Sequence, residues 1–317
     1  MSGISKDRAE AIAESVDKFG KKKTAEIFGV SEESVNRYLR QSKGPKLNGV
    51  DSRPEHLPKV LVFDIETSPI LARVCSIWQQ NVGLNQIKND WFVIAYAAKW
   101  LGVDDVIYKD LRGQIDDATE DRPILQGIWQ LLNDADVVIT QNGKKFDCKK
   151  LNARFIMNGY QPPSHYKHID TCQIAKSVFG FTSNKLEYMT DKLCTKHKKM
   201  VVRKFSGFAL WKGCLADNLE AWKEMEHYNK LDVLSLEELY HVMAPWDRKH
   251  PNFSLLAGCE MPTCRCGSTE FVRNGYAYTQ VSKFQKYRCT KCGAETRGRT
   301  NVLDKDERKA LHMNISQ

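Results

Sequence analysis

Two acidic residues directly follow one of the most apolar runs of the chain. In the stretch LVFDIETS, Asp64 and Glu66 come at the end of the run that begins at Val60. Residues i and i+2 of a β-strand point to the same face, so both carboxylates would project together from the end of a buried strand. Such a pair repels itself and is costly to bury unless a cation bridges it. Divalent ions such as Mg²⁺ suit these oxygen ligands.

Two later segments add polar side chains of the same kind. The segment VVITQNGKKFDCKKL predicts a buried strand, a turn at Asn142 and a helix that begins near Asp147. The segment MEHYNKLDVLSL predicts a helix on which Tyr228 and Asp232, four residues apart, share one face. In chain order the three motifs are D-x-E, N-x3-F-D and Y-x3-D.

Together the motifs resemble those of the DEDD superfamily of 3′–5′ exonucleases, which have an RNase H-like fold. The tyrosine is typical of the branch that contains the proofreading domains of family-B DNA polymerases, and residues 208–240 resemble stand-alone phage-encoded members. The resemblance implies a two-metal-ion hydrolysis from the 3′ end of nucleic acid, DNA in preference to RNA, that releases 5′-monophosphates. Tyr228 would orient the attacking water. The implied ligands of two Mg²⁺ or Mn²⁺ ions are Asp64, Glu66, Asp147 and Asp232.

Two nearby positions have alternative interpretations. His227 also matches H-x4-D, the third motif of the histidine branch of the family, in which the histidine is the general base. On a continuous helix Tyr228 lies on the face of Asp232 and His227 points away, which favours Tyr228. Asp170 precedes a predicted helix, where it either lines the site or, as we favour, caps the helix N-terminus.

The elements that must position these residues form a predicted α/β domain, an RNase H-like mixed sheet with flanking helices over residues 59–250. The expected strands are 59–65, 91–98, 105–109 and 136–140, and the expected helices are 123–133, 146–157, 171–178, 185–194 and 218–243. A structure-specific endonuclease that uses the same metal ions is an alternative function.

Residues 1–41 predict a helix-turn-helix domain, with a turn at Gly29 and Ser31 as the N-cap of the second helix. A small protein-interaction domain is the alternative. The Gly- and Pro-rich residues 42–58 predict a linker. The residues predicted to contact nucleic acid here and in the sheet domain are Asn36, Arg37, Arg40, Asn142, Lys150 and Arg154.

Residues 259–300 predict a zinc-ribbon-like β module, followed by a C-terminal tail at 301–317. Asn274-Gly275 predicts a two-residue hairpin turn. The pair in CTKCG is typical of half a zinc ribbon, whereas CRCG has one intervening residue in place of two, so Cys259 could replace Cys264. A module this small has too little hydrophobic core to fold without a crosslink or a bound metal, which favours structural Zn²⁺. The predicted zinc ligands are Cys264, Cys266, Cys289 and Cys292.

The composition is typical of a soluble protein, and its charge fits either an acidic polymer partner or a solvated basic surface. The net charge is +9, and residues 259–317 carry 11 Lys and Arg against 6 Asp and Glu. The ten scattered cysteines favour reduced thiols, and no apolar run is long enough to span a membrane. Both observations favour the cytoplasm of a bacterial or phage-infected cell. The expected partners are a single-stranded 3′ end and a replication or repair protein, with no membrane; the oligomeric state stays open. A DNA-binding regulator or a recombination or transposition factor is the alternative, because such proteins join similar modules.

Overall fold

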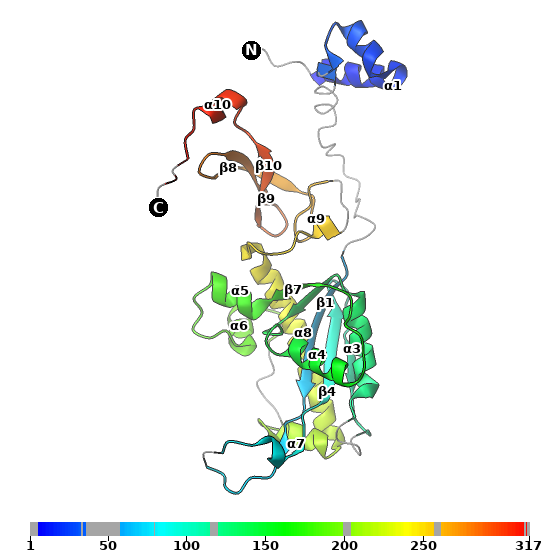
Figure 1. Cartoon of the computed structure of the whole chain (residues 1–317), viewed down its shortest axis with the longest axis vertical. Helices are drawn as coiled ribbons and strands as arrows, with labels where there is room; N and C mark the ends of the chain where they lie inside the picture. The colour runs from blue at the N-terminus through cyan, green and yellow to red at the C-terminus, as the bar shows by residue number, and fades with distance from the viewer. Residues whose placement is uncertain are drawn as a thin grey trace. The chain divides into compact units, whose positions relative to one another are not determined.

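The structure is a computed structural model that describes residues 6–32, 34–35, 58–78, 80–114, 120–198, 204–256, 261–313 and 315. The chain divides into two compact units, Met1–Arg53 and Pro54–Gln317 (Figure 1). Among the described helices, none has the length and apolar character needed to cross a lipid bilayer.

The first unit contains α1 (Lys6–Phe28), whose helical backbone is interrupted at Gly20. Ile12, Ala25 and Val35 form its small core. Ser31 Oγ accepts a hydrogen bond from the backbone N–H of Ser34 at 3.2 Å, which confirms the predicted N-cap. The predicted contacts Asn36, Arg37 and Arg40 lie outside the described residues. The helix-turn-helix assignment therefore stays a prediction.

In the second unit, five described strands form a mixed sheet in the order β5-β4-β1-β6-β7. Strand β1 is antiparallel to β4 and parallel to β6, which is itself parallel to β7. The strands are β1 (Val60–Thr67), β4 (Val93–Trp100), β5 (Ile107–Asp110), β6 (Val137–Thr140) and β7 (Lys167–Asp170). The mixed sheet agrees with the predicted RNase H-like fold, and four of its strands were expected within two residues of their observed starts.

Helices cover both faces of this sheet, so the central strands are apolar on both sides. Leu61 and Phe63 pack in one core with residues of α3 and α4, whereas Val60 and Val62 pack in a second core with residues of α5 and α6. The alternation places Asp64 and Glu66 on the face of Val60. The helices are α3 (Arg122–Asp134), α4 (Asp147–Met157), α5 (Thr171–Val178), α6 (Leu186–Leu193) and α7 (Ala209–Leu215).

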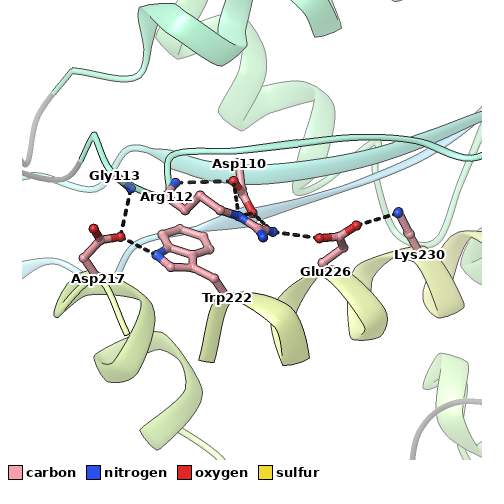
Figure 2. A network of polar contacts seen from close by, with 7 residues as sticks. All are labelled: Asp110, Arg112, Gly113, Asp217, Trp222, Glu226 and Lys230. Carbon is pink, nitrogen blue, oxygen red and sulfur yellow. Dashed lines mark hydrogen bonds and ion pairs between the residues drawn. The ribbon is translucent and has the colours of Figure 1, made fainter. Parts of the chain in front are cut away.

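The longest of the described helices, α8 (Leu219–Met243), contributes residues to both cores. Polar contacts join it to the sheet at two positions along its length. Arg112, just beyond β5, donates to Asp110 at 2.5 Å and to Glu226 of α8 at 2.7 Å (Figure 2). Further along, the buried Lys99 of β4 pairs with Glu237 of α8 at 2.5 Å. These contacts determine where the side chains of α8 lie along the sheet.

Shorter elements complete the unit. A two-stranded arm is formed by β2 (Leu71–Ala72) and β3 (Ile87–Asn89), with η1 (Leu84–Gln86) between them. After α8 follow η2 (Ala244–Trp246), α9 (Phe253–Leu256), β8 (Phe271–Tyr278), β9 (Lys283–Cys289), β10 (Glu295–Asn301) and α10 (Lys305–Lys309). The last three strands form a separate antiparallel sheet in the order β10-β9-β8.

The predicted hairpin turn at Asn274-Gly275 is wrong. Both residues lie inside β8, where the register with β9 shifts between Arg273 and Tyr276. Gly275 has a φ of 71°, which a β-bulge accommodates as readily as a tight turn. The chain reverses later, where the backbone N–H of Thr279 donates to the carbonyl of Ser282.

Arg154 also differs from expectation. Its guanidinium donates two hydrogen bonds to Asp121, at 2.7 and 2.8 Å, and both side chains are buried. Asp121 additionally accepts the backbone N–H of Val93 at the start of β4. The pair joins α4 to the segment before α3, so Arg154 is a structural residue and is not accessible to a phosphate backbone.

We predict that Asp121→Ala lowers the free energy of unfolding by about 3–5 kcal/mol, because it leaves the buried guanidinium of Arg154 without this carboxylate. Glu120→Ala is the matched control, since Glu120 forms an exposed pair with Arg122 and should change stability by at most about 1 kcal/mol. Urea unfolding followed by tryptophan fluorescence measures both, and it reports on this domain because all seven tryptophans lie within residues 78–246. Equal stability of the two variants would contradict this role of the pair.

Candidate functional site

The three sequence motifs meet at one cavity of about 630 Å³. Its lining includes Asp64 and Glu66 from β1, Asp147 from the start of α4, and Tyr228 and Asp232 from α8. Asp64 is half-buried, and the other four residues are at most 9% exposed. The structure therefore brings together the four implied metal ligands and Tyr228.

A tight turn between β6 and α4 places Asp147. Asn142 adopts a φ of 65°, and a Cβ on the next residue, Gly143, would lie 2.2 Å from Thr140 Oγ1. The backbone can approach this closely only with glycine at that position. The carboxylate of Asp170 accepts the backbone N–H groups of Asn142 and Lys144, at 2.9 and 3.2 Å.

Asp170 also caps α5, as predicted. Its carboxylate accepts the backbone N–H groups of Cys172 and Gln173, at 3.0 and 3.3 Å. One carboxylate thus connects the turn before α4 to the N-terminus of α5. Asp170 is not among the residues that line the cavity, so its position favours the structural interpretation.

Neutral donors hold the acidic side chains in place. The backbone N–H of Ile65, between the two acids of β1, donates to Asp147 at 3.2 Å. The buried Asn229 donates through Nδ2 to Asp64 at 2.8 Å. Asn229 was missed by the sequence analysis, although it is a polar residue next to Tyr228 on the buried side of an otherwise amphipathic helix. It links the first motif to the third.

Burial raises the pKa of Asp147 to about 6, and the N–H of Ile65 offsets part of this effect. The negative charge of Asp170 contributes a smaller increase to the pKa of Asp147. An acid in such a position ionises more readily when a cation is beside it. The site therefore has the electrostatic character of a cation-binding site.

The donor set fits divalent cations with oxygen ligands. Four carboxylates face one cavity, and the amide oxygen of Asn229 is buried without a hydrogen bond from the residues the structure describes. Carboxylate oxygens are the ligands that Mg²⁺ and Mn²⁺ prefer in proteins.

A model of the RNase_H superfamily matches residues 61–244, which is more than half of the chain. The chain belongs to this superfamily. A solved structure similar to it is the family B DNA polymerase from the hyperthermophilic archaeon Pyrobaculum calidifontis, at 14% sequence identity and a TM-score of 0.43. That match covers 64% of this chain and 27% of the polymerase chain. No curated protein matches the sequence.

The remaining candidate residues of this RNase_H superfamily domain differ in whether they line the cavity. Asn142, predicted to contact nucleic acid, lines it together with the exposed Lys176 and Lys185, which the sequence analysis missed. Lys150 lies instead with its Nζ 3.5 Å from the centre of the Trp91 ring, and burial lowers its pKa. His227 is exposed on α8 and is absent from the cavity lining.

The C-terminal module contains a second possible metal centre. The sulfur atoms of Cys264, Cys266, Cys289 and Cys292 all lie within 4.8 Å of one another. Cys264 and Cys292 are 3.5 Å apart, and Cys266 and Cys289 are 3.6 Å apart. Four thiolates at this spacing fit tetrahedral Zn²⁺. The alternative ligand Cys259 lies outside the described residues.

We predict that the purified protein contains about one zinc ion per chain and that Cys289→Ser loses it, because a structural site needs all four ligands. Cys75→Ser is the control, since Cys75 is an exposed free cysteine remote from this cluster in sequence. Elemental analysis of the variants measures the bound metal. Unchanged zinc content in Cys289→Ser would refute the four-cysteine site.

Proposed function

We propose that the protein is a metal-dependent 3′–5′ exonuclease of the DEDD type, in the tyrosine branch. The observation that carries the proposal is the convergence of Asp64, Glu66, Asp147, Tyr228 and Asp232, from three distant segments, on one cavity. Membership of the RNase_H superfamily supports a nuclease fold. The direction of hydrolysis and the resemblance to phage-encoded enzymes rest on the sequence motifs.

In this proposal the four acids hold two Mg²⁺ or Mn²⁺ ions, which supply charge neutralisation at the phosphate and acidify the attacking water. The hydroxyl of Tyr228 hydrogen-bonds that water and keeps it in line with the scissile bond, because a phenol retains its proton at neutral pH. Asn229 keeps Asp64 in position. Lys176 and Lys185 supply positive charge for the phosphates of the bound strand.

We predict that Asp232→Asn lowers the rate of hydrolysis on the order of 10³-fold or more, because it removes a metal ligand while the domain stays folded. Asp64→Ala should do the same, and the double variant should be no slower than either, since the acids act as a unit. The measurement is degradation of 5′-labelled single-stranded DNA and RNA with Mg²⁺ or Mn²⁺.

Asp134→Asn is the control for an acidic residue in a similar sequence setting. It belongs to the triplet DAD, it is exposed, and it lies at the end of α3 outside the cavity lining. This variant should retain full activity. Stepwise shortening from the 3′ end supports an exonuclease, whereas internal cleavage products would indicate an endonuclease. Substantial activity in Asp64→Ala would disprove the metal-ligand assignment.

We also predict that Tyr228→Phe lowers kcat by about 10- to 100-fold without weakening metal binding, because only the hydroxyl that orients the water is lost. His227→Ala should stay within about twofold of the parent, as expected for an exposed side chain outside the cavity. Steady-state kinetics over a range of Mg²⁺ concentrations separates the two effects. The reverse ranking would place the protein in the histidine branch.

A further inference from the structure

The C-terminal sheet presents aromatic and basic side chains on one face. In the register of β8 and β9, Tyr276 is opposite Gln285 and Tyr278 is opposite Lys283, while Arg273 is opposite Tyr287. Opposed residues lie on the same face, and β9 residues 283, 285 and 287 share it as well. The bulge at Asn274 and Gly275 restores the alternation, so all of these residues lie together. We call this set the tyrosine face: Arg273, Tyr276, Tyr278, Lys283, Gln285 and Tyr287.

Tyr276 and Tyr278 of the tyrosine face are not part of the core of the module. The buried residues Cys264, Cys289 and Ala294 form that core, with Phe271 packed against them at one end of the sheet. Tyr276 is 43% exposed and Tyr278 is 71% exposed. Two large aromatic side chains on the same strand, open to solvent, are typical of a binding surface rather than of a packed sheet.

Ion pairing distinguishes this face from the opposite one. Glu295 is the one acidic residue in the sequences of the three strands, and it lies on the other face, where it pairs with Lys286 at 3.2 Å and Arg288 at 2.8 Å. The tyrosine face has Arg273 and Lys283 without an acidic residue of these strands to offset them. Its charge is therefore complementary to a polyanion.

The positive charge of Lys283 lies next to one of the two exposed tyrosine rings. Lys283 Nζ lies 4.1 Å from the centre of the Tyr276 ring, which orients the ring and places a positive charge beside it. Tyr276 and Tyr278 are two residues apart on one strand, a separation of roughly 7 Å. Sheets that display aromatic residues in this way stack two or three unpaired bases in other nucleic-acid-binding domains.

We propose that the tyrosine face binds single-stranded nucleic acid, with bases stacked on Tyr276 and Tyr278 and phosphates contacted by Arg273 and Lys283. A duplex fits less well, because its bases are already stacked on each other and their faces are covered. The choice of ligand rests on the proposed nuclease function. The tyrosine face would bind an internal part of the strand, while the end of the strand is hydrolysed in the cavity.

The test measures binding in the full chain that carries Asp232→Asn, so that the probe is not hydrolysed. Fluorescence anisotropy with labelled 20-mers of dT and of rU gives Kd without added divalent metal. Tyr276→Ala and Tyr278→Ala should each weaken binding by about 5- to 100-fold, because each loses one stacked base. Tyr276→Phe and Tyr278→Phe should retain affinity within about threefold, since they keep the ring. The oligonucleotide that binds the parent with the lower Kd is the preferred ligand.

Val272→Ala is the matched control. Val272 is 51% exposed on the same strand, but it pairs with Arg288 on the opposite face. It should bind as the parent does, and the zinc content of every variant should be unchanged. A variant with both tyrosines replaced by alanine that binds both oligonucleotides as tightly as the parent would overturn the proposal.

This assay is independent of hydrolysis. If the protein had no nuclease activity while binding still depended on Tyr276 and Tyr278, only the proposed activity would fail. If the protein degraded DNA while the double alanine variant bound normally, only the binding site would fail. Photocrosslinking of a 5-bromouracil oligonucleotide provides a second readout, since the crosslinked peptide should contain residues 273–287.

Discussion

Mutual repulsion among buried carboxylates is the constraint on which the arrangement of the sheet domain depends. Asp147 and Asp232 are 3% and 4% exposed, and Asp64 and Glu66 face the same cavity. Asp64 accepts a hydrogen bond from the amide of Asn229, and Asp147 accepts one from the backbone N–H of Ile65. These neutral donors position the two carboxylates without cancelling their charge. The retained negative charge favours the binding of divalent cations.

Holding these charges together requires a rigid support, and α8 supplies it. Glu226 and Glu237 join the helix to β5 and β4 through Arg112 and Lys99. Glu238 accepts backbone N–H groups of residues 195–197. The acidic side chains outside the cavity therefore secure α8 against its neighbours. The acidic side chains inside the cavity face its interior, and a shift of α8 by one turn would separate Asp232 from β1.

The parts of the site that sequence patterns predict are those with a strong period or a rare residue combination. The acids of β1 follow a buried strand, and Asp232 follows Tyr228 by one helical turn, so both were predicted together with the four cysteines. Contacts between distant segments were not predictable in the same way. The motif sequence does not reveal that Asn229 reaches Asp64, or that Asp121 neutralises Arg154, because such pairs depend on how the helices pack.

Local ambiguity accounts for a different error. Asn-Gly suits a two-residue hairpin because both residues tolerate positive φ, and Gly275 has that conformation inside β8. The same conformation serves a bulge, and the choice between them depends on pairing with β9, which is set at a distance. The short arm formed by β2 and β3 was also missed. Strands of two and three residues are too short to show a recognisable alternation of apolar and polar residues.

The irregular spacing in CRCG has a structural consequence of its own. The residue between the two cysteines is Arg265, whose guanidinium donates to the carbonyl oxygens of Ala244, at 3.1 Å, and of Asp247. These carbonyls follow the C-terminus of α8, where a positive charge is favourable. The backbone that orients two of the cysteines thus also carries the contact to the end of α8. Binding of zinc by Cys264 and Cys266 would order Arg265 as well, so the metal would stabilise the junction between the module and the helix that carries Tyr228 and Asp232.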